Sequence, residues 1–294
     1  MLIARLIADP ATLETRLDAA TKALAAAGMK LAQAQMLDFC GDVLELELAA
    51  DDADALRGIL IDHFGPCDAL IAHDEIRVPQ IFVSDMDSTM IGQECIDELA
   101  DYANIKPQIA EITERAMQGE LDFESALRER VGLLAGLGEE AIEQCLAERI
   151  RPNPGARVLV ETLKSRGCHT VLVTGGFHHF ADPVAEMIGC ERVVGNRLEV
   201  MGGKLTGGLV GAITDSSVKQ SVLEEEAARL GEGVVTMAAG DGANDIPMLA
   251  ASTYGVAYYA KPKARDAANG WIDRGDLTAL LKLLEIREED WVAY

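Results

Sequence analysis

Short apolar runs alternate with longer helical segments from residue 79 to the end of the 294-residue chain. Four of the runs have the length and composition of buried strands: IFVSD (81–85), HTVLVTGG (169–176), VVTMAAGDG (234–242) and YGVAYYA (254–260). Such alternation is typical of a parallel sheet wrapped by helices. We therefore predict an α/β fold with a Rossmann-like parallel sheet for this part of the chain.

The alternation is interrupted once, directly after the first predicted strand. Four helical segments follow one another there without a strand: 94–105, 106–118, 122–136 and 138–150. They predict a helical cap inserted into the α/β domain at about residues 93–150, and Pro152 and Pro154 mark the return to the sheet. Further along, RLEVMGGKLTGGLV (197–210) predicts a hairpin with a Gly-Gly turn.

The first 78 residues have a different pattern. Their apolar spacing predicts strand, helix, strand, strand, helix and strand, in the runs 2–8, 12–27, 29–38, 42–49, 52–65 and 67–74. This order is the ferredoxin-like βαββαβ arrangement, so we expect one domain at 1–78 and a second at 79–294. The pattern resembles ACT domains, which implies a serine-sensing role or a homodimer formed through this domain. A docking or dimerisation module without a ligand is the alternative.

Charge and composition limit the partners. The formal net charge of −23 argues against nucleic acid and against anionic membrane surfaces. No apolar run approaches the ~20 residues that span a bilayer, and the first residues meet Asp9 and Pro10 too early for a signal peptide. None of the six cysteines forms a C-x-x-C pair, which is typical of reduced thiols in a cytoplasmic protein.

Chemically active residues follow three of the predicted strands. Asp85 and Asp87 follow the first, Thr174 and Gly175 end the second, and Asp241 follows the third. In a parallel α/β sheet, ligands bind at the carboxyl ends of the strands, so these residues are expected to meet at one rim.

The two aspartates of the first strand also predict a metal. Residues i and i+2 of an extended segment face the same way, so Asp85 and Asp87 reach the same space. With Asp241 beside them, three carboxylates would repel one another unless a cation lay among them. Hard oxygen ligands of this kind suit Mg²⁺.

Four motifs now carry a family resemblance. They are D-x-D-x-T at 85–89, T-G at 174–175, Lys219 just before the helix that precedes the third strand, and G-D-G-x-N-D at 240–245. In this order they resemble the four-motif set of the haloacid dehalogenase superfamily, and the resemblance covers residues 79–294.

Further segments narrow the resemblance. DSTMIGQECIDELA, MQGELDFESALRERVGLL, TGGF, NRLEV, GKLTG, GDGANDIPML and the RPNPG stretch at 151–155 together resemble the phosphoserine phosphatase family. The resemblance implies Mg²⁺-dependent hydrolysis of O-phospho-L-serine through an aspartyl-phosphate, the last step of serine biosynthesis.

The resemblance assigns the catalytic roles as follows. Asp85 is the nucleophile, and Asp87 protonates the leaving serine oxygen and then acts as base for the attacking water. Thr174 and the Gly175 amide hold phosphate oxygens, and Lys219 stabilises the charge that develops on the phosphoryl group.

The metal ligands are implied in the same way. They are the carboxylates of Asp85 and Asp241 and the backbone carbonyl of Asp87, with Asp245 supporting Asp241. Asn244, in the same motif, is implied to bind substrate.

Substrate selection is implied to lie with the cap. Glu94 resembles the acid that binds the substrate ammonium, and Arg130 resembles the arginine that takes its carboxylate in a fork. Taken alone, both residues would be interpreted as surface helix charge, and only their placement within the family pattern favours substrate binding. Arg128 is expected to be solvated or structural, and Met117 and Phe123 are expected to shield the pocket.

One departure and two alternatives remain open. The family usually has serine where Thr174 stands, and the extra methyl group is expected to narrow the phosphate pocket. One alternative is a phosphomonoesterase acting on phosphothreonine or a sugar phosphate. The other is an amino-acid-sensing protein with an inactive phosphatase domain, against which the intact Asp85, Asp87, Lys219 and Asp241 argue.

Overall fold

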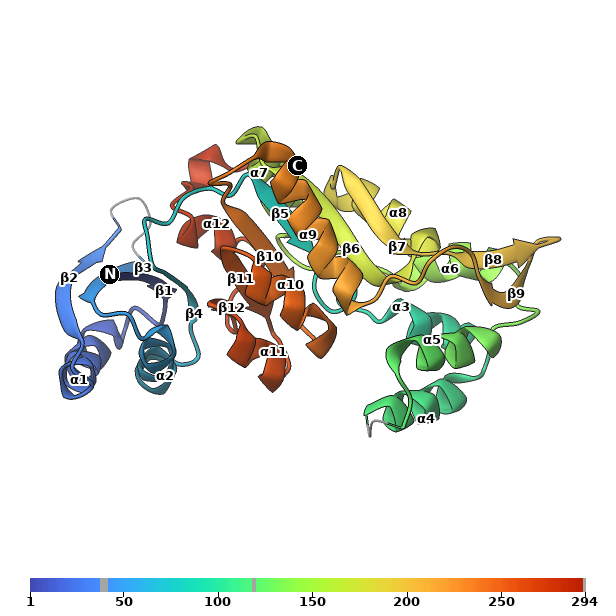
Figure 1. The fold of residues 1–294 in the computed structure, drawn as a ribbon, viewed down its shortest axis with the longest axis horizontal. Coiled ribbons are helices and arrows are strands. Elements are labelled where there is room, and N and C mark those ends of the chain that lie inside the picture. The colour runs from blue at the N-terminus through green and yellow to red at the C-terminus, as the bar shows by residue number, and fades with distance from the viewer. Residues whose placement is uncertain (38–41, 118–119, 293–294) are drawn as a thin grey trace.

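A computed structural model describes residues 1–37, 42–117 and 120–292, with Met117 described by its backbone alone. In this part of the chain the strands form a ten-stranded sheet in the order β2-β3-β1-β4-β12-β11-β10-β5-β6-β7, and β8 and β9 form a separate hairpin (Figure 1). The predicted α/β class is confirmed, because β12, β11, β10, β5, β6 and β7 run parallel.

The N-terminal segment has the predicted order of elements. They are β1 (Leu2–Ile7), α1 (Leu13–Ala26), β2 (Lys30–Met36), β3 (Val43–Ala49), α2 (Ala53–Phe64) and β4 (Asp68–Ala72). The strands pair antiparallel, with β1 between β3 and β4. Both helices pack on one face of this sheet, where Leu24, Leu60 and Phe64 join a single apolar cluster. Asp52 caps α2 by accepting a hydrogen bond from the N–H of Ala55 at 2.9 Å.

The remaining residues form the larger α/β core, a helical cap and the hairpin. The core contains β5 (Ile81–Ser84), α7 (Ala156–Ser165), β6 (His169–Phe177), α8 (His178–Ile188), β7 (Arg192–Asn196), α9 (Ser216–Leu230), β10 (Thr236–Gly240), α10 (Ile246–Ala251), β11 (Tyr254–Tyr258), α11 (Pro262–Ala267), β12 (Gly270–Ile272) and α12 (Ala279–Leu283). The cap contains α3 (Cys95–Tyr102), α4 (Lys106–Met117), α5 (Phe123–Gly132) and α6 (Glu140–Arg149), and the hairpin β8 (Leu198–Met201) and β9 (Lys204–Leu209).

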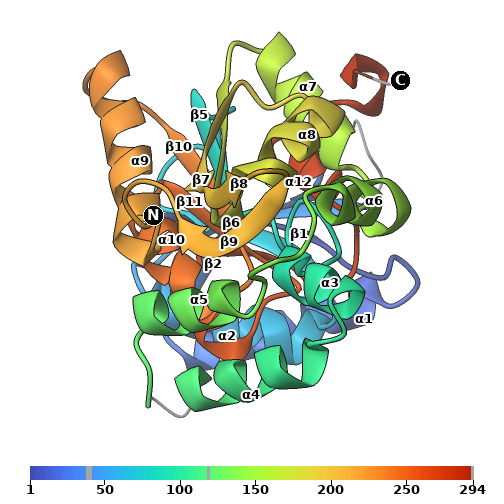
Figure 2. The same cartoon turned by 90° about the vertical axis from the view of Figure 1, so that its right-hand side faces the viewer.

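Helices cover both faces of the parallel strands. Figure 2 shows α9 and α10 on one side and α7, α8 and α12 on the other. Successive residues of β5 serve different faces: Phe82 belongs to one apolar cluster and Val83 to the other. A strand buried on both faces reads as a continuous apolar run, which is why IFVS shows no alternation.

The two predicted domains share one sheet. β4 pairs antiparallel with β12, so that Leu70 lies opposite Gly270 and Ala69 opposite Trp271. At the start of β4 the buried Asp68 carboxylate accepts hydrogen bonds from the backbone N–H groups of residues 273–275, at 2.8, 2.8 and 3.0 Å. The division at residue 78 therefore stays a prediction, and the junction is built from buried contacts rather than a free linker.

The cap lies at one end of the sheet, beyond the carboxyl end of β5 (Figure 1). The hairpin supports it from the side: the N–H of Gly136 donates to the carbonyl of Leu205 at 2.8 Å, and the N–H of Leu205 donates to the carbonyl of Leu137 at 2.9 Å. These bonds connect the loop between α5 and α6 to β9. The predicted insertion, return and hairpin are all present.

Three details differ from the sequence expectations. The strands β7 and β12 were not predicted, because RVVGN and GWI are short and each contains glycine. Lys219 was expected just before its helix, but α9 begins at Ser216 and Lys219 lies in its first turn. The cause is Asp215, which caps the helix by accepting from the N–H groups of Ser217 and Val218.

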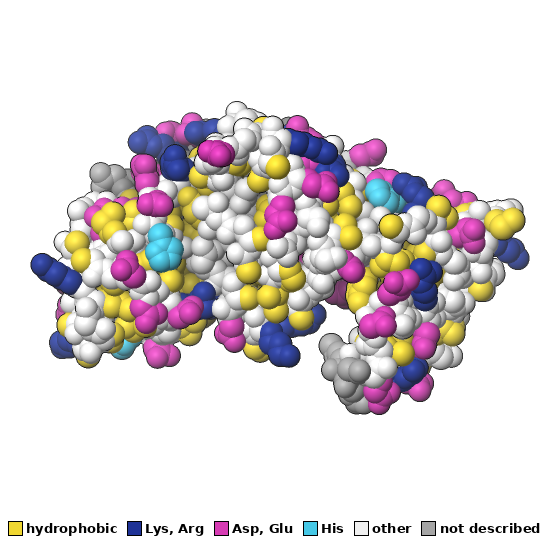
Figure 3. Space-filling model, in the orientation of Figure 1, with side chains coloured by type: hydrophobic (Ala, Val, Ile, Leu, Met, Phe, Trp, Pro, Cys, Tyr) yellow, Lys and Arg dark blue, Asp and Glu magenta, His cyan; other side chains and the backbone are white. Residues whose placement is uncertain are grey.

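Within the described residues, no helix is both long and apolar enough to cross a membrane. On the face drawn in Figure 3, Asp and Glu side chains are scattered among Lys and Arg over the whole molecule. The negative charge on this face is therefore spread out, and a site for an anionic substrate has to be built locally.

Candidate active site

The site lies where three neighbouring strands end. β5 lies between β10 and β6, with Ser84 opposite Ala239 on one side and Leu172 on the other. Asp85 lies one residue beyond this level, and Asp241 and Thr174 lie two residues beyond it, so the three side chains come together at the carboxyl ends of the strands, as predicted. All three are buried, at 4%, 8% and 1% exposure.

Asp85 is held by two donors on one oxygen. Its Oδ1 accepts from the N–H of Met86 at 2.8 Å and lies 2.7 Å from the Lys219 ammonium. Burial, and then the charge of Asp245, raise the pKa of Asp85 well above its usual range, and Lys219 opposes them. Among the described residues no hydrogen bond reaches Oδ2, which therefore remains the oxygen available to a ligand.

Lys219 is the buried counter-charge of the site. It is 1% exposed, and its ammonium lies 2.7 Å from oxygens of both Asp85 and Asp245. Burial alone would lower the pKa of Lys219, but these two carboxylates raise it above the ordinary value, so the side chain stays charged.

Asp245 has a structural place in the cluster. Its Oδ1 binds Lys219, and its Oδ2 accepts from the N–H groups of Asp241 and Gly242 at 3.1 and 3.0 Å. A Cβ at Gly240 would lie 2.5 Å from Cγ of Asp245, so only glycine fits there. Both oxygens of Asp245 are thus engaged, one with Lys219 and the other with the loop that carries Asp241.

The cluster has the chemistry of a cation site. Oxygens of Asp85, Asp241 and Asp245 all lie within 4.8 Å of one another, and all three residues are buried. Lys219 compensates only part of this charge, and burial raises the pKa of Asp241. A hard divalent cation with oxygen ligands would supply the missing positive charge. The residues present therefore fit such an ion.

Asp87 lines the same cavity as Asp85. Its Oδ1 accepts from the N–H of Cys95 at 3.0 Å, at the start of α3. Burial raises the pKa of Asp87 above its usual value, which favours the protonated form needed for a proton donor. A Cβ at Gly176 would lie 2.9 Å from Oδ2 of Asp87, so this glycine allows β6 to approach the acid closely.

The end of β6 supplies the hydroxyl of Thr174 and the backbone amide of Gly175. Oγ1 of Thr174 accepts from the N–H of Gly176 at 2.8 Å. Asn196 fixes the same turn, because its side-chain amide donates to the carbonyl of Gly175 at 2.8 Å. The methyl group of Thr174 faces Gly195, where a Cβ would lie 3.2 Å from it, so the extra carbon points toward β7.

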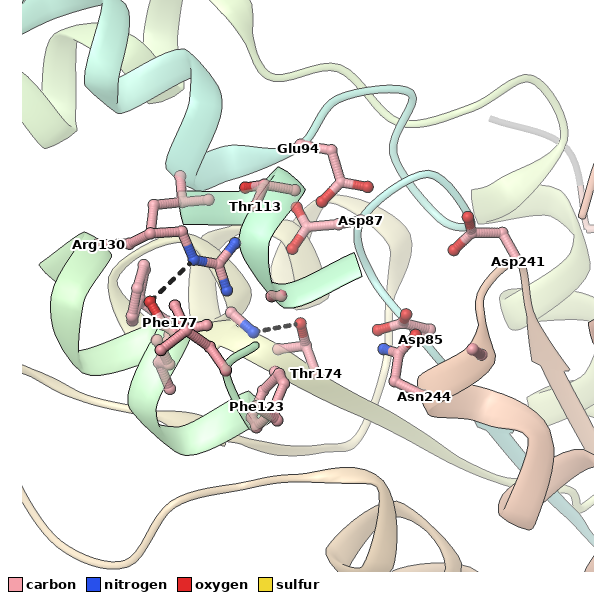
Figure 4. A pocket seen from close by; sticks show the side chains of 18 of the residues that line it. Asp85, Asp87, Glu94, Thr113, Phe123, Arg130, Thr174, Phe177, Asp241 and Asn244 are labelled. Atoms are coloured by element: carbon pink, nitrogen blue, oxygen red, sulfur yellow. Dashed lines mark hydrogen bonds between the residues drawn. The ribbon is translucent and has the colours of Figure 1, made fainter. Parts of the chain in front are cut away.

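A cavity of about 420 Å³ separates the core from the cap. In Figure 4, Asp85, Asp241 and Asn244 face Arg130 and Phe123 across it. All the predicted site residues except Lys219 line it: Asp85, Asp87, Glu94, Arg130, Thr174, Gly175, Asp241 and Asn244. Lys219 does not line the cavity, but its ammonium contacts Oδ1 of Asp85 at 2.7 Å.

Arg130 points into this cavity from α5. Its Nε donates to the carbonyl of Ala126 at 3.3 Å, and burial lowers the pKa of its guanidinium. Its neighbour Arg128 is exposed and pairs with Glu124 one turn away at 2.7 Å, as expected for a solvated residue. One face of α5 is thus directed at the cavity and the other at solvent.

Glu94 occupies the opposite wall, next to the D-x-D segment. It accepts from the hydroxyl of Ser88 at 2.8 Å. Burial, and then the charge of Asp87, raise the pKa of Glu94 to about 7. Phe123 also lines the cavity, with its ring against Gly175, whereas the side chain of Met117 lies outside the described residues.

Sequence reasoning missed two polar lining residues, Lys261 and Thr113. Lys261 follows β11, the fourth predicted strand, so its position at a strand end is a signal that the sequence contains. Thr113 lies on α4 among other polar cap residues, and nothing in its local sequence distinguishes it.

Comparison with known proteins agrees with this geometry. The family profile of haloacid dehalogenase-like hydrolases matches residues 82–250. The chain belongs to this family. A phosphoserine phosphatase of Streptococcus thermophilus is 44% identical over 210 residues, which are 71% of this chain and 97% of that protein.

Two crystal structures align over nearly the whole chain. A HAD family hydrolase of Salmonella enterica serovar Typhi superposes with a TM-score of 0.83 at 27% identity, covering 97% of this chain and 99% of that one. An unliganded probable phosphoserine phosphatase of Vibrio cholerae gives 0.75 at 29% identity, covering 98% and 87%. Both alignments include the N-terminal segment.

Proposed function

We propose that this chain hydrolyses O-phospho-L-serine to serine and phosphate. One observation carries the proposal: a single cavity is lined by the aspartate cluster, by the cation Arg130 from the cap, and by the anion Glu94 next to the D-x-D segment. A phosphorylated amino acid has the matching three groups. The phosphate meets the cluster, the carboxylate meets Arg130 and the ammonium meets Glu94.

The metal of the proposal is Mg²⁺. The carboxylates of Asp85 and Asp241 and the backbone carbonyl of Asp87 would hold it, with Asp245 fixing the loop of Asp241. When bound, the ion neutralises charge between the carboxylates and the phosphate oxygens.

The protein groups then divide the chemistry. A carboxylate oxygen of Asp85 attacks phosphorus, and the bond from phosphorus to the serine oxygen breaks. Asp87, whose pKa burial raises, donates its proton to the leaving oxygen. Asp87 then takes a proton from the water that attacks the aspartyl-phosphate, which releases phosphate and restores Asp85.

Charge and position assist both steps. Lys219 already contacts Asp85 at 2.7 Å, so it is placed to stabilise negative charge on the transferring group. Thr174, the Gly175 amide and Asn244 line the same end of the cavity and would orient the phosphate oxygens.

We further propose that residues 1–78 act as an ACT-like module that senses serine or forms a homodimer. The βαββαβ order and the exposed edge strand β2 support this. Light scattering with and without serine tests it. The cytoplasm is the proposed location, since the described cysteines are free thiols.

A substrate panel tests the proposed reaction. Phosphate release should be measured with L-phosphoserine, L-phosphothreonine and a sugar phosphate, each with Mg²⁺ and again after EDTA. We expect the highest kcat/KM for phosphoserine and loss of activity with EDTA. A higher kcat/KM for one of the other esters would assign the chain to that substrate, and no release from any ester would indicate an inactive phosphatase domain.

A further inference from the structure

We infer that Lys261 competes with the divalent cation for Asp241 and thereby weakens the affinity of the metal site. The inference rests on the metal site of the proposed function. Lys261 lines the cavity and is a cation that neither the four motifs nor the predicted substrate contacts include. Its ammonium lies 3.4 Å from Oδ2 of Asp241, on the carboxylate that Lys219 does not contact among the described ion pairs.

The backbone places Lys261 against Asp241. The N–H of Lys261 donates to the carbonyl of Asp241 at 2.8 Å, so main chain and side chain meet the same residue. Two residues earlier, Tyr259 takes a left-handed conformation with φ of 42°, which is rare for a residue with a large side chain. Strained residues persist where the surrounding structure fixes them, and often at functional sites.

That surrounding structure is present on both sides of Lys261. The N–H of Tyr259 donates to the carbonyl of Ile272 at 2.9 Å, and its hydroxyl donates to the carbonyl of Gly275 at 3.1 Å. Pro262 then begins α11 directly after Lys261, with its fixed φ suited to a first helical position. The position of Lys261 is therefore built into the fold.

A second cavity leaves room for the Lys261 side chain to move away from Asp241. Besides the substrate cavity, Glu94, Asp241 and Lys261 line a second cavity of about 540 Å³, on the side of Ser88 and Tyr259. The Lys261 side chain is 60% exposed. It can leave Asp241 for solvent when a metal arrives, without entering the space for the substrate.

We therefore expect Lys261 and the metal to compete for Asp241, rather than Lys261 and Asp241 to stay paired when the metal is bound. The ammonium of Lys261 is 3.4 Å from Asp241 and its side chain is 60% exposed, so the ion pair is weak and a divalent cation with several oxygen ligands displaces the lysine. The displaced ammonium still lies near a doubly charged ion, and that repulsion adds to the lost pair. Both effects reduce the affinity for the metal, while Lys219, 1% exposed, stays in place.

The test measures metal binding without substrate. Free Mn²⁺ is followed by electron paramagnetic resonance during titration of the unaltered 294-residue chain, its Lys261→Met variant and its Lys261→Arg variant. Removing the charge should lower the Kd for Mn²⁺ by roughly 3- to 10-fold, and the gap should shrink at high salt. The arginine variant keeps the charge and should stay within about twofold of the unaltered chain.

Two further variants separate the explanations. Lys263→Met removes an exposed positive charge two residues away and should leave the Kd unchanged. An unchanged Kd in Lys261→Met, or an equal fall in Lys263→Met, would overturn the inference. A raised KM for phosphoserine with an unchanged Kd would also overturn it, because Lys261 would then be a substrate contact. Asp241→Asn should bind Mn²⁺ much more weakly, and if it does not, the proposed metal site itself is wrong.

Discussion

Replacing Arg130 by alanine is the most informative test of substrate recognition. Arg130 reaches the cavity from α5, and its one hydrogen bond among the described residues runs from Nε to the carbonyl of Ala126. The remaining N–H groups of the guanidinium are therefore free to bind a carboxylate in the cavity. Alanine would remove this fork while leaving the aspartate cluster of the core untouched.

The expected size of the effect follows from the kind of contact. A partly buried hydrogen bond between charged groups contributes about 1.5–3 kcal/mol, which corresponds to roughly 10- to 150-fold in kcat/KM for phosphoserine. Phenyl phosphate lacks both the carboxylate and the ammonium, and phosphoethanolamine lacks only the carboxylate. Neither should lose more than about twofold, because neither uses the arginine.

The assay is kcat/KM for these three esters, measured for Arg130→Ala and for Arg128→Ala as a matched control. Arg128 is on the same helix and carries the same charge, but it is exposed and pairs with Glu124. The control should therefore behave like the unaltered enzyme. Equal losses on all three esters in Arg130→Ala would refute the reasoning, since Arg130 would then act on the cap as a whole.

Three more outcomes follow from the buried charges and the shared sheet. Lys219→Met leaves two buried carboxylates uncompensated and should lower the free energy of unfolding by about 3–5 kcal/mol in urea titrations without metal; an unchanged midpoint would contradict this. The pKa of Glu94 is about 7, so its carboxylate becomes protonated and loses its negative charge as pH falls through that value. KM for phosphoserine should therefore rise below pH 7, and Glu94→Gln, with a high KM throughout, should lack that rise. A chain beginning at Arg77 exposes the buried Trp271 and the edge of β12, so its Tm should fall while kcat/KM per folded site stays within about tenfold; an unchanged Tm would count against the shared sheet.

The sequence allowed most of the site to be predicted, because strand ends are local features. An apolar run followed by Asp85 and Asp87 places both carboxylates beyond a strand, and the same holds for Thr174 and Asp241. Their convergence then depends only on the strands being parallel neighbours, which the order β10-β5-β6 satisfies. The catalytic roles of these residues stay predictions.

The features that escaped prediction depend on contacts between distant segments. The antiparallel pairing of β4 with β12 joins residues about two hundred positions apart, and no local sequence pattern predicts this pairing. Asp68 reads as an ordinary strand residue, yet its carboxylate holds the backbone of 273–275. The inferred role of Lys261 likewise depends on its distance to Asp241, which the sequence does not show.

The central claim is that Asp85 carries the phosphoryl group during hydrolysis of phosphoserine. It is tested most directly by acid-quenching the enzyme during turnover with L-phosphoserine and Mg²⁺, and locating the added phosphoryl group by mass spectrometry. We predict one phosphoryl group on the peptide containing Asp85, and neither phosphoryl group nor turnover in a folded, metal-loaded Asp85→Asn variant. Substantial kcat in that variant, or a phosphoryl group on another residue, would contradict the account.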